Sequence, residues 1–157
     1  MGKYGIARLD LVKGHARHYD FDQPIENGTL GEEDYVTGKL VPTKDVTKRQ
    51  KFVASVANTY DSRDESEFRN EVGGMEVRGY TLVEDDTITT TKIDFSGDRS
   101  NIGAVVKGDF AYAKVGGNFV VSSTFPTVDP IPAQVFRVEE KTTLNGQDAL
   151  ALKIEKA

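Results

Sequence analysis

Two histidines and several carboxylate groups are the residues of this chain whose types could support metal binding or acid–base catalysis. His15 and His18 lie three positions apart, a spacing that would place two metal ligands on one face of a helix. Gly14 precedes the pair and no glutamate follows the first histidine, so the helical zinc-protease pattern is absent. The sequence therefore predicts a solvent-facing pair in a loop, with a metal site as the alternative.

The acidic residues do not have the spacing of a known catalytic or calcium site. Residues 61–67, DSRDESE, lack the alternating ligands and the central glycine of a calcium-binding loop. They are predicted to form a solvated acidic loop. Glu84, Asp85 and Asp86 are adjacent, but nothing in the sequence associates them with a pocket, and they are predicted to be turn residues.

The glycine pairs and the serines also lack the context that catalysis would need. The pairs at 73–74 and 116–117 are not followed by Lys and Ser or Thr, as a phosphate-binding loop requires, and both are predicted to be turns or bulges. No serine lies in a G-x-S-x-G motif. The sequence thus predicts no catalytic, cofactor-binding or metal-binding residue, and a protein that is not an enzyme.

The composition limits the kind of protein that this chain can be. It has 157 residues and no cysteine. Disulfides, thiolate metal sites and cysteine nucleophiles are therefore excluded, and synthesis in a reducing cytoplasm is expected. The first twelve residues, MGKYGIARLDLV, lack the apolar core of a signal peptide, and no run approaches the roughly 20 apolar residues that span a bilayer. No membrane association is expected.

The formal net charge of −5 at pH 7 argues against general affinity for nucleic acid. A local basic cluster consists of Lys44, Lys48, Arg49 and Lys51. Asp45 interrupts it, and no aromatic residue is interleaved to stack on a base. The cluster is predicted to be a solvated polar edge, with nucleic-acid contact as the alternative, and no specific nucleic-acid partner is expected.

Short apolar stretches separated by Gly, Asn and Asp predict an all-β fold that is mainly antiparallel. The expected form is a compact barrel or sandwich with long loops and at most one or two short helices. A single domain is expected over residues 1–157, with 1–34 as a candidate for a partly extended N-terminal arm. The predicted strands are 4–12, 35–41, 52–58, 75–83, 87–95, 102–106, 110–115, 118–122 and the two arms of a C-terminal hairpin. Residues 14–34 are predicted to be a loop with one short strand near 19–21, and 60–71 a surface excursion.

Turn chemistry predicts how several of these strands connect. Asn145-Gly146 favours a two-residue type I′ hairpin, because asparagine tolerates and glycine readily adopts positive φ. Gly116-Gly117 predicts a second hairpin, and residues 84–86 are predicted to join a strand pair. Residues 126–132, PTVDPIP, should run extended outside the sheets, because proline has no amide hydrogen to donate. The apolar stretch FVASVA at 52–57 is expected to be buried on both faces.

Four segments carry a resemblance to a known class of protein. They are GIARLDLVKG, FVASVANTYD, EVRGYTLVEDDTITTTK and FRVEEKTTLNGQDALALKI. Their order and character resemble small head proteins of tailed bacteriophages, which are encoded beside the major capsid protein and regarded as head decoration or capsid-stabilising proteins. The resemblance implies a virion structural protein on the capsid surface, made in the bacterial host cytoplasm. It also implies the major capsid protein as partner and a homo-oligomer, with a trimer favoured.

On this hypothesis the capsid contacts lie in the first strand, 4–12, and in the charged excursion, 60–71. The candidate residues are Tyr4, Ile6, Arg8, Leu9, Arg63, Asp64, Glu67 and Arg69.

Other functions are compatible with the same pattern. A tail-tube or head-completion subunit would have a similar β structure but would form rings or tubes. A non-catalytic glycan- or protein-binding β-sandwich module could use Tyr19, Phe21 and Tyr35 in a site built from loops. A small β-barrel hydrolase ranks last, because it needs two acidic groups that converge on a pocket.

Overall fold

The computed structural model describes residues 4–55, 69–72 and 76–156. Over these ranges the chain forms β-strands and one short 3-10 helix, η2 (Ile102–Ala104). The strands are β1 (Ala7–Leu11), β2 (His15–Tyr19), β3 (Leu30–Glu33), β4 (Leu40–Pro42), β5 (Lys51–Val53), β6 (Val77–Thr81), β7 (Thr87–Thr90), β8 (Phe110–Ala113), β9 (Phe119–Ser122), β10 (Val135–Leu144) and β11 (Gln147–Lys156). The predicted all-β fold class is confirmed.

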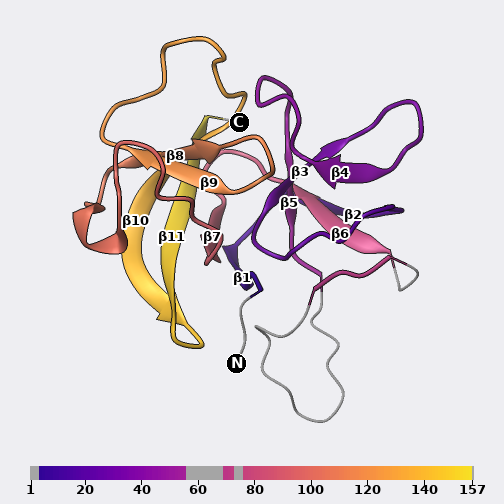
Figure 1. The fold of residues 1–157 in the computed structure, drawn as a ribbon, viewed down its shortest axis with the longest axis horizontal. Coiled ribbons are helices and arrows are strands. Elements are labelled where there is room, and N and C mark those ends of the chain that lie inside the picture. The colour runs from indigo at the N-terminus through magenta and orange to yellow at the C-terminus, as the bar shows by residue number, and fades with distance from the viewer. Residues whose placement is uncertain (1–3, 56–68, 73–75, 157) are drawn as a thin grey trace.

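The strands form two antiparallel sheets that pack side by side (Figure 1). Sheet A contains six strands in the order β1-β7-β11-β10-β8-β9, and sheet B contains five in the order β2-β6-β5-β3-β4. The chain crosses between the sheets more than once. Within residues 1–34, β1 belongs to sheet A, whereas β2 and β3 belong to sheet B.

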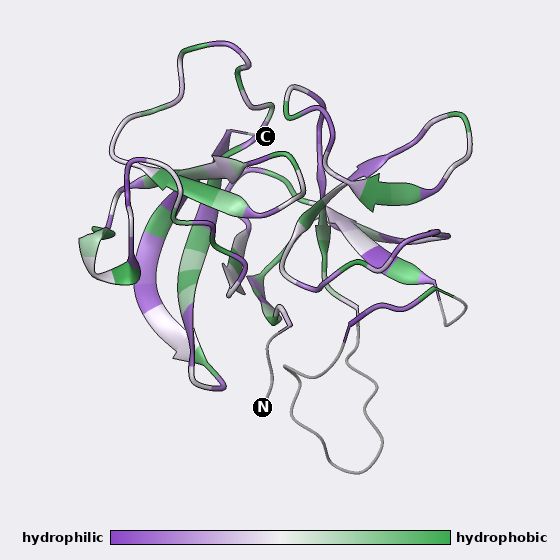
Figure 2. Ribbon diagram, viewed as in Figure 1, coloured by the Kyte–Doolittle hydropathy of each residue, from purple (hydrophilic) through white to green (hydrophobic). Residues whose placement is uncertain are grey.

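The hairpin of β10 and β11 is the one that Asn145-Gly146 predicts. Both turn residues have positive φ, 49° for Asn145 and 80° for Gly146, as a type I′ turn requires. Apolar and polar residues alternate over 136–139 and 152–155, and Figure 2 shows hydrophobic and hydrophilic stretches along both arms. Phe136 and Val138 of β10 and Leu150, Leu152 and Ile154 of β11 are buried in the core. The hairpin predicted at Gly116-Gly117 is also confirmed, as β8 and β9.

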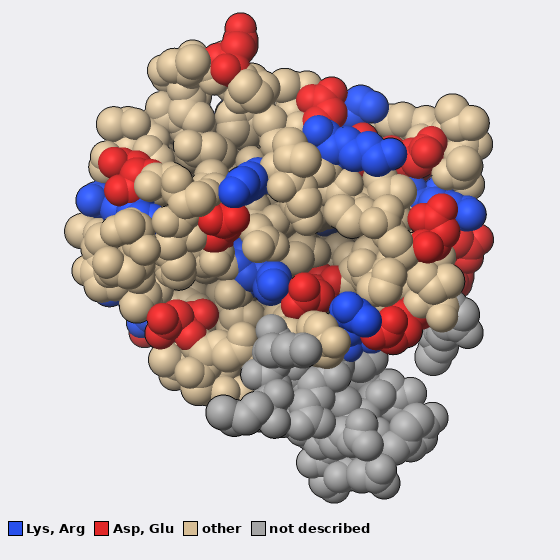
Figure 3. All heavy atoms as spheres, viewed as in Figure 1, with Lys and Arg blue, Asp and Glu red and all other residues tan. Residues whose placement is uncertain are grey.

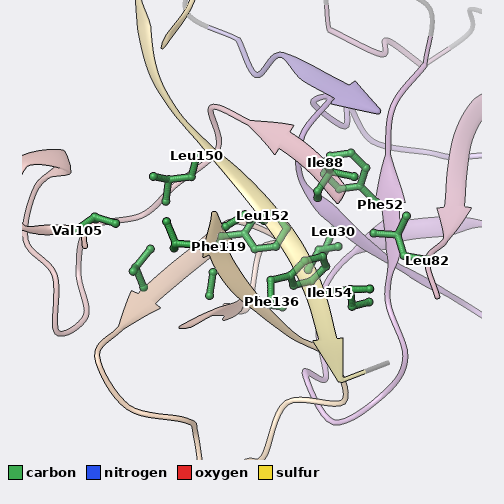
Figure 4. Packing of buried hydrophobic residues seen from close by; sticks show 14 of the residues in the cluster. Leu30, Phe52, Leu82, Ile88, Val105, Phe119, Phe136, Leu150, Leu152 and Ile154 are labelled. Atoms are coloured by element: carbon green, nitrogen blue, oxygen red, sulfur yellow. The ribbon is translucent and has the colours of Figure 1, made fainter. Parts of the chain in front are cut away.

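Aromatic side chains from both sheets form the centre of one core. The ring centroid of Phe52 in sheet B lies 6.4 Å from that of Phe119 in sheet A, and Phe119 meets Phe136 edge-on at 5.2 Å. All three side chains are 0% exposed. Leu30 of sheet B and Leu152 of sheet A pack in the same cluster (Figure 4). The two sheets are therefore held together by apolar burial.

A second, smaller apolar cluster involves other residues of sheet B. It consists of Tyr19, Ile25, Leu40, Val53 and Val77. Phe52 and Val53 are neighbours in β5 and belong to different clusters, because successive side chains of a strand point to opposite faces. Both are 0% exposed, which confirms burial on both faces for these two residues of the predicted stretch.

The prediction that residues 84–86 join a strand pair is wrong. β6 pairs with β2 and β5, and β7 pairs with β1 and β11, so the two strands lie in different sheets. The buried carboxylate of Asp86 accepts hydrogen bonds from the amides of Lys13, Gly14 and Val83, at 2.8, 3.1 and 2.9 Å. The Asp86 carboxylate thus links the β1–β2 and β6–β7 connections, because the amides that it accepts from lie in these connections and outside the strands.

The strand predicted at 102–106 is also wrong, since this segment contains helix η2. The side chain of Asn101 accepts a hydrogen bond from the amide of Ala104 at 3.0 Å and caps the helix. A capping side chain of this kind favours a helical turn over an extended chain.

Most of the strand predicted at 35–41 is a turn, and only β4 forms at its end. The carboxylate of Asp34 accepts from the amide of Val36 at 2.9 Å, and Gly38 has a φ of 74°. These local hydrogen bonds compete with a strand, because a short acidic side chain can satisfy the backbone in a turn.

The loop predicted at 14–34 contains β2 and β3 in addition to irregular chain. Tyr19 lies opposite Val77, and Leu30 lies opposite Phe52. Each partner is more than 20 residues away along the chain, so local sequence periodicity could not indicate the pairing.

A partly buried ion pair fixes the segment around η2 to the start of β8. Arg99 donates two hydrogen bonds of 2.9 Å to the Asp109 carboxylate, and the amide of Val106 donates another of 2.8 Å. Burial alone would raise the pKa of Asp109, but these donors outweigh it and hold the pKa below its usual value.

Asp109→Asn is expected to lower the free energy of unfolding at pH 7 by about 1.5–3 kcal/mol, because hydrogen bonds to a charged group are lost. Because the pKa of Asp109 is lower in the folded protein than in the unfolded chain, its carboxylate stabilises the fold at pH values above the unfolded pKa of about 4. This stabilisation is lost as the pH falls through the lower pKa of the folded state. The stabilities of wild type and variant should therefore converge in acid. Urea unfolding between pH 2.5 and 7 measures this, with the exposed Asp148→Asn as control. A difference that stays constant with pH would contradict the expectation.

Candidate interaction surface

The two histidines lie on a strand, which corrects the predicted loop. His15 and His18 are both exposed and belong to β2. A separation of three along a strand places the two side chains on opposite faces, so they do not converge on one metal. In the described part of the chain no three His, Cys, Asp or Glu residues group closely enough to hold a metal ion.

The basic cluster makes contacts within the chain. Lys48 Nζ lies 3.7 Å from the Glu32 carboxylate, and Arg49 donates to the carbonyl of Leu82 at 2.7 Å. Lys51 Nζ donates to Thr81 Oγ1 at 2.8 Å, and burial lowers the pKa of Lys51. These side chains therefore contribute to sheet B and its connections.

The structure places Tyr4, from the first predicted contact region, beside Arg69, which lies in the described part of the second. The guanidinium carbon of Arg69 lies 4.8 Å from the centroid of the Tyr4 ring, a cation–π arrangement. Arg69 Nε also donates to the Glu71 carboxylate at 2.8 Å. An aromatic ring from the N-terminal segment and a cation 65 positions later thus share one surface.

Two sets of contacts hold these segments in place. Asn70 and Ile25 exchange backbone hydrogen bonds of 3.1 Å in both directions. The carboxylate of Glu26 accepts from the Gly5 amide at 2.8 Å and pairs with Lys92 Nζ at 3.2 Å. We define the N-terminal surface as Tyr4, Glu26, Arg69, Glu71 and Lys92. Glu26 and Lys92 carried no sequence signal, since only the fold places them beside Tyr4 and Arg69.

The other predicted contact residues have different environments. Ile6 is 2% exposed, so its side chain belongs to the interior. Arg8 is partly buried, and Leu9, on the same strand, is 38% exposed. Arg63, Asp64 and Glu67 lie outside the described residues, as do the glycine pair at 73–74 and residues 61–67.

The aromatic residues proposed for a glycan site do not form an exposed set. Tyr19 is 3% exposed, and its hydroxyl donates to the Glu33 carboxylate at 3.1 Å. Burial, with this hydrogen bond, raises the pKa of Tyr19 to about 12. Phe21 packs against the second apolar cluster. Only Tyr35 of the three is fully displayed to solvent, with 83% of its surface exposed.

A surface groove of about 440 Å³ lies between the outward side of the β8–β9 hairpin and the loop 123–132. Tyr112 and Val120 line it from the hairpin, and Phe125, Val128 and Pro130 line it from the loop. The prolines keep this segment out of the sheets, as predicted, and its apolar side chains therefore have no sheet to pack in. We call this feature the proline-loop groove.

None of the helical segments in the described ranges is long or apolar enough to cross a membrane. Comparisons of the chain with protein-family models, with curated proteins and with solved structures gave no match.

Proposed function

We propose that this chain is a virion structural protein that binds the major capsid lattice of a tailed bacteriophage and stabilises the head as a decoration protein. Its main structural support is the N-terminal surface. The segments containing Tyr4 and Arg69, chosen separately as contact regions, lie against each other there. One partner can therefore contact both segments at a single patch.

The chemistry of the N-terminal surface suits protein recognition. Tyrosine and arginine are enriched among residues that dominate binding energies. The side chains of Arg69 and Glu71 are 33% and 56% exposed, so both remain available at the rim of an interface. Exposed ion pairs contribute only about 0–1 kcal/mol each. Tight attachment would therefore come from many copies or from an oligomer that contacts several capsid subunits.

Two buried carboxylates are used by the fold itself. Asp86 accepts from three backbone amides, and Asp109 is paired with Arg99. The charged residues on the face in Figure 3 are interspersed in sign and do not form one dense acidic or basic field. Such a surface favours specific pairing with a protein over general attraction to a polyanion.

The test is to mix the purified protein with undecorated phage heads, both immature and expanded, and to measure cosedimentation. Saturable binding with a stoichiometry that matches the capsid lattice is the expected result. Failure to bind any form of head would overturn the proposed function. Electron microscopy of the products separates a decorated shell from the rings or tubes of a tail-tube or head-completion subunit.

Arg69→Ala is expected to weaken head binding by about tenfold or more, because it removes a cation that is stacked on an aromatic ring at the contact. Equilibrium binding to purified heads measures the loss.

Arg137→Ala is a matched control. Arg137 lies 4.5 Å from the ring centroid of Phe110 and 3.0 Å from Glu155, but on β10 and away from the N-terminal surface. The affinity of the Arg137→Ala variant for purified heads should stay within about twofold of wild type. Equal losses for the two variants would remove the N-terminal surface from the contact.

A further inference from the structure

We propose that Asn145 is a site of spontaneous deamidation, at which the backbone nitrogen of Gly146 converts the asparagine into an aspartyl or isoaspartyl residue. The sequence contains two Asn-Gly pairs, Asn27-Gly28 and Asn145-Gly146. Both pairs permit the attack, because glycine has no Cβ to shield its own nitrogen. The fold encloses the first pair and exposes the second. This modification goes beyond capsid binding and is measured without phage heads.

The reaction needs only the chain and water. The amide nitrogen of Gly146 loses its proton to solvent and bonds to Cγ of Asn145. The Cγ–Nδ2 bond breaks and ammonia leaves with a proton taken from solvent, which closes a succinimide ring. Water then adds to either carbonyl carbon of the ring. Cleavage between Cγ and the Gly146 nitrogen gives aspartate, and cleavage between the Asn145 backbone carbon and that nitrogen gives isoaspartate.

The Asn145-Gly146 pair is open to this reaction. Both residues are exposed, and Figure 1 shows their turn at the lower end of the β10–β11 hairpin. A Cβ built on Gly146 would meet no atom within 4 Å, so the ring has room and water can reach it. The attack requires the turn to open. None of the residues 139–148 is buried, so opening this end of the hairpin disrupts few core contacts and is cheap.

The fold encloses the Asn27-Gly28 pair. Asn27 is 6% exposed, and its side chain both donates to the carbonyl and accepts from the amide of Ser55, at 2.9 Å each. The attacking nitrogen, that of Gly28, donates to the Val53 carbonyl at 2.8 Å. A Cβ built on Gly28 would collide with Thr90 Oγ1. Attack at this pair therefore requires buried hydrogen bonds to break where no water replaces them.

The isoaspartyl product alters the end of the hairpin. It carries the main chain through Cβ and Cγ and so lengthens by one carbon atom a turn whose length fixes the strand register. The pairing of Leu144 with Gln147 beside the turn should therefore be lost. Gln147 Nε2 also donates to the carbonyl of Tyr4 at 3.2 Å, so the modification acts on a residue that holds the N-terminal surface.

Peptide mass spectrometry of the full chain tests the site, after incubation at physiological temperature and mildly alkaline pH. Deamidation at Asn145 should be at least about tenfold faster than at Asn27, because attack at Asn27 requires its hydrogen bonds to break first. Asn27 is a matched control, since glycine follows it too. In urea that unfolds the chain the two rates should become similar. Equal rates in the folded protein, or a difference that persists in urea, would overturn the proposal.

Hydrogen exchange tests the effect on the hairpin. In incubated protein that carries isoaspartate at position 145, the amides of 143–148 should exchange at least about tenfold faster than in fresh protein. Asn145→Asp is the control, because it has the charge of the product but an unmodified main chain, and aspartate also suits the turn. Its exchange should match that of fresh wild type. Unchanged exchange in the isoaspartyl form would contradict the predicted effect on the turn. Neither measurement bears on head binding, so failure here is distinct from failure of the proposed function.

Discussion

Phe119→Ala is expected to lower the free energy of unfolding by about 3–5 kcal/mol. Phe119 is 0% exposed and lies between the two sheets, with Phe52 of sheet B on one side and Phe136 of sheet A on the other. Its removal deletes apolar burial and leaves a cavity, because rings fixed on two different sheets cannot both move to fill the space.

Urea unfolding followed by circular dichroism measures this loss. Tyr35→Ala serves as the control, since an aromatic side chain that is 83% exposed should change the stability by no more than about 0.5 kcal/mol. A loss below about 1 kcal/mol for Phe119→Ala would mean that the sheets do not depend on this packing.

Gly117→Ala is expected to destabilise the protein by about 1–3 kcal/mol more than Gly116→Ala, because it adds overpacking to backbone strain. Both glycines have positive φ, 102° for Gly116 and 98° for Gly117, so both substitutions carry a similar strain. A Cβ on Gly117 would lie 2.3 Å from the carbonyl oxygen of Leu30, whereas a Cβ on Gly116 meets nothing within 4 Å.

The close approach at Gly117 allows a hydrogen bond between the two sheets. Its carbonyl accepts a hydrogen bond of 2.8 Å from the amide of Leu30, which joins the β8–β9 turn of sheet A to β3 of sheet B. Alanine would push these two backbones apart and weaken the link. Chemical denaturation of the two variants side by side measures the difference, and equal stabilities would show that the turn can move away from β3 at no cost.

Local chemistry was enough to predict some of the elements from the sequence. Asn145-Gly146 and Gly116-Gly117 each specify a turn by the conformations that these residues adopt, and the flanking strands pair within a few residues. The prolines of 126–132 exclude that segment from a sheet for an equally local reason, the missing amide hydrogen. The alternation of apolar residues likewise indicated strands, and hence an all-β fold, before any partner strand was known.

The candidate contact segments were chosen from the sequence, but their relation to each other was not visible there. Tyr4 and Arg69 meet because Ile25 pairs with Asn70 and Glu26 holds Gly5. These are contacts between segments that lie 21 or more residues apart in sequence.

The error at residues 84–86 has the same origin, whereas those at 35–41 and 102–106 come from local hydrogen bonds to Asp34 and Asn101. Residues 84–86 were predicted to join a strand pair, but the Asp86 carboxylate accepts hydrogen bonds from amides of the β1–β2 connection and the chain enters the other sheet instead. By itself, therefore, the sequence determined the all-β class, the two glycine-containing hairpin turns and the exclusion of 126–132 from the sheets, because those properties depend on each residue and its immediate neighbours. Only the tertiary structure decided which strands pair, which apolar side chains stay exposed and which charges are used by the fold, because those depend on distant segments that compete for the same hydrogen bonds and the same core.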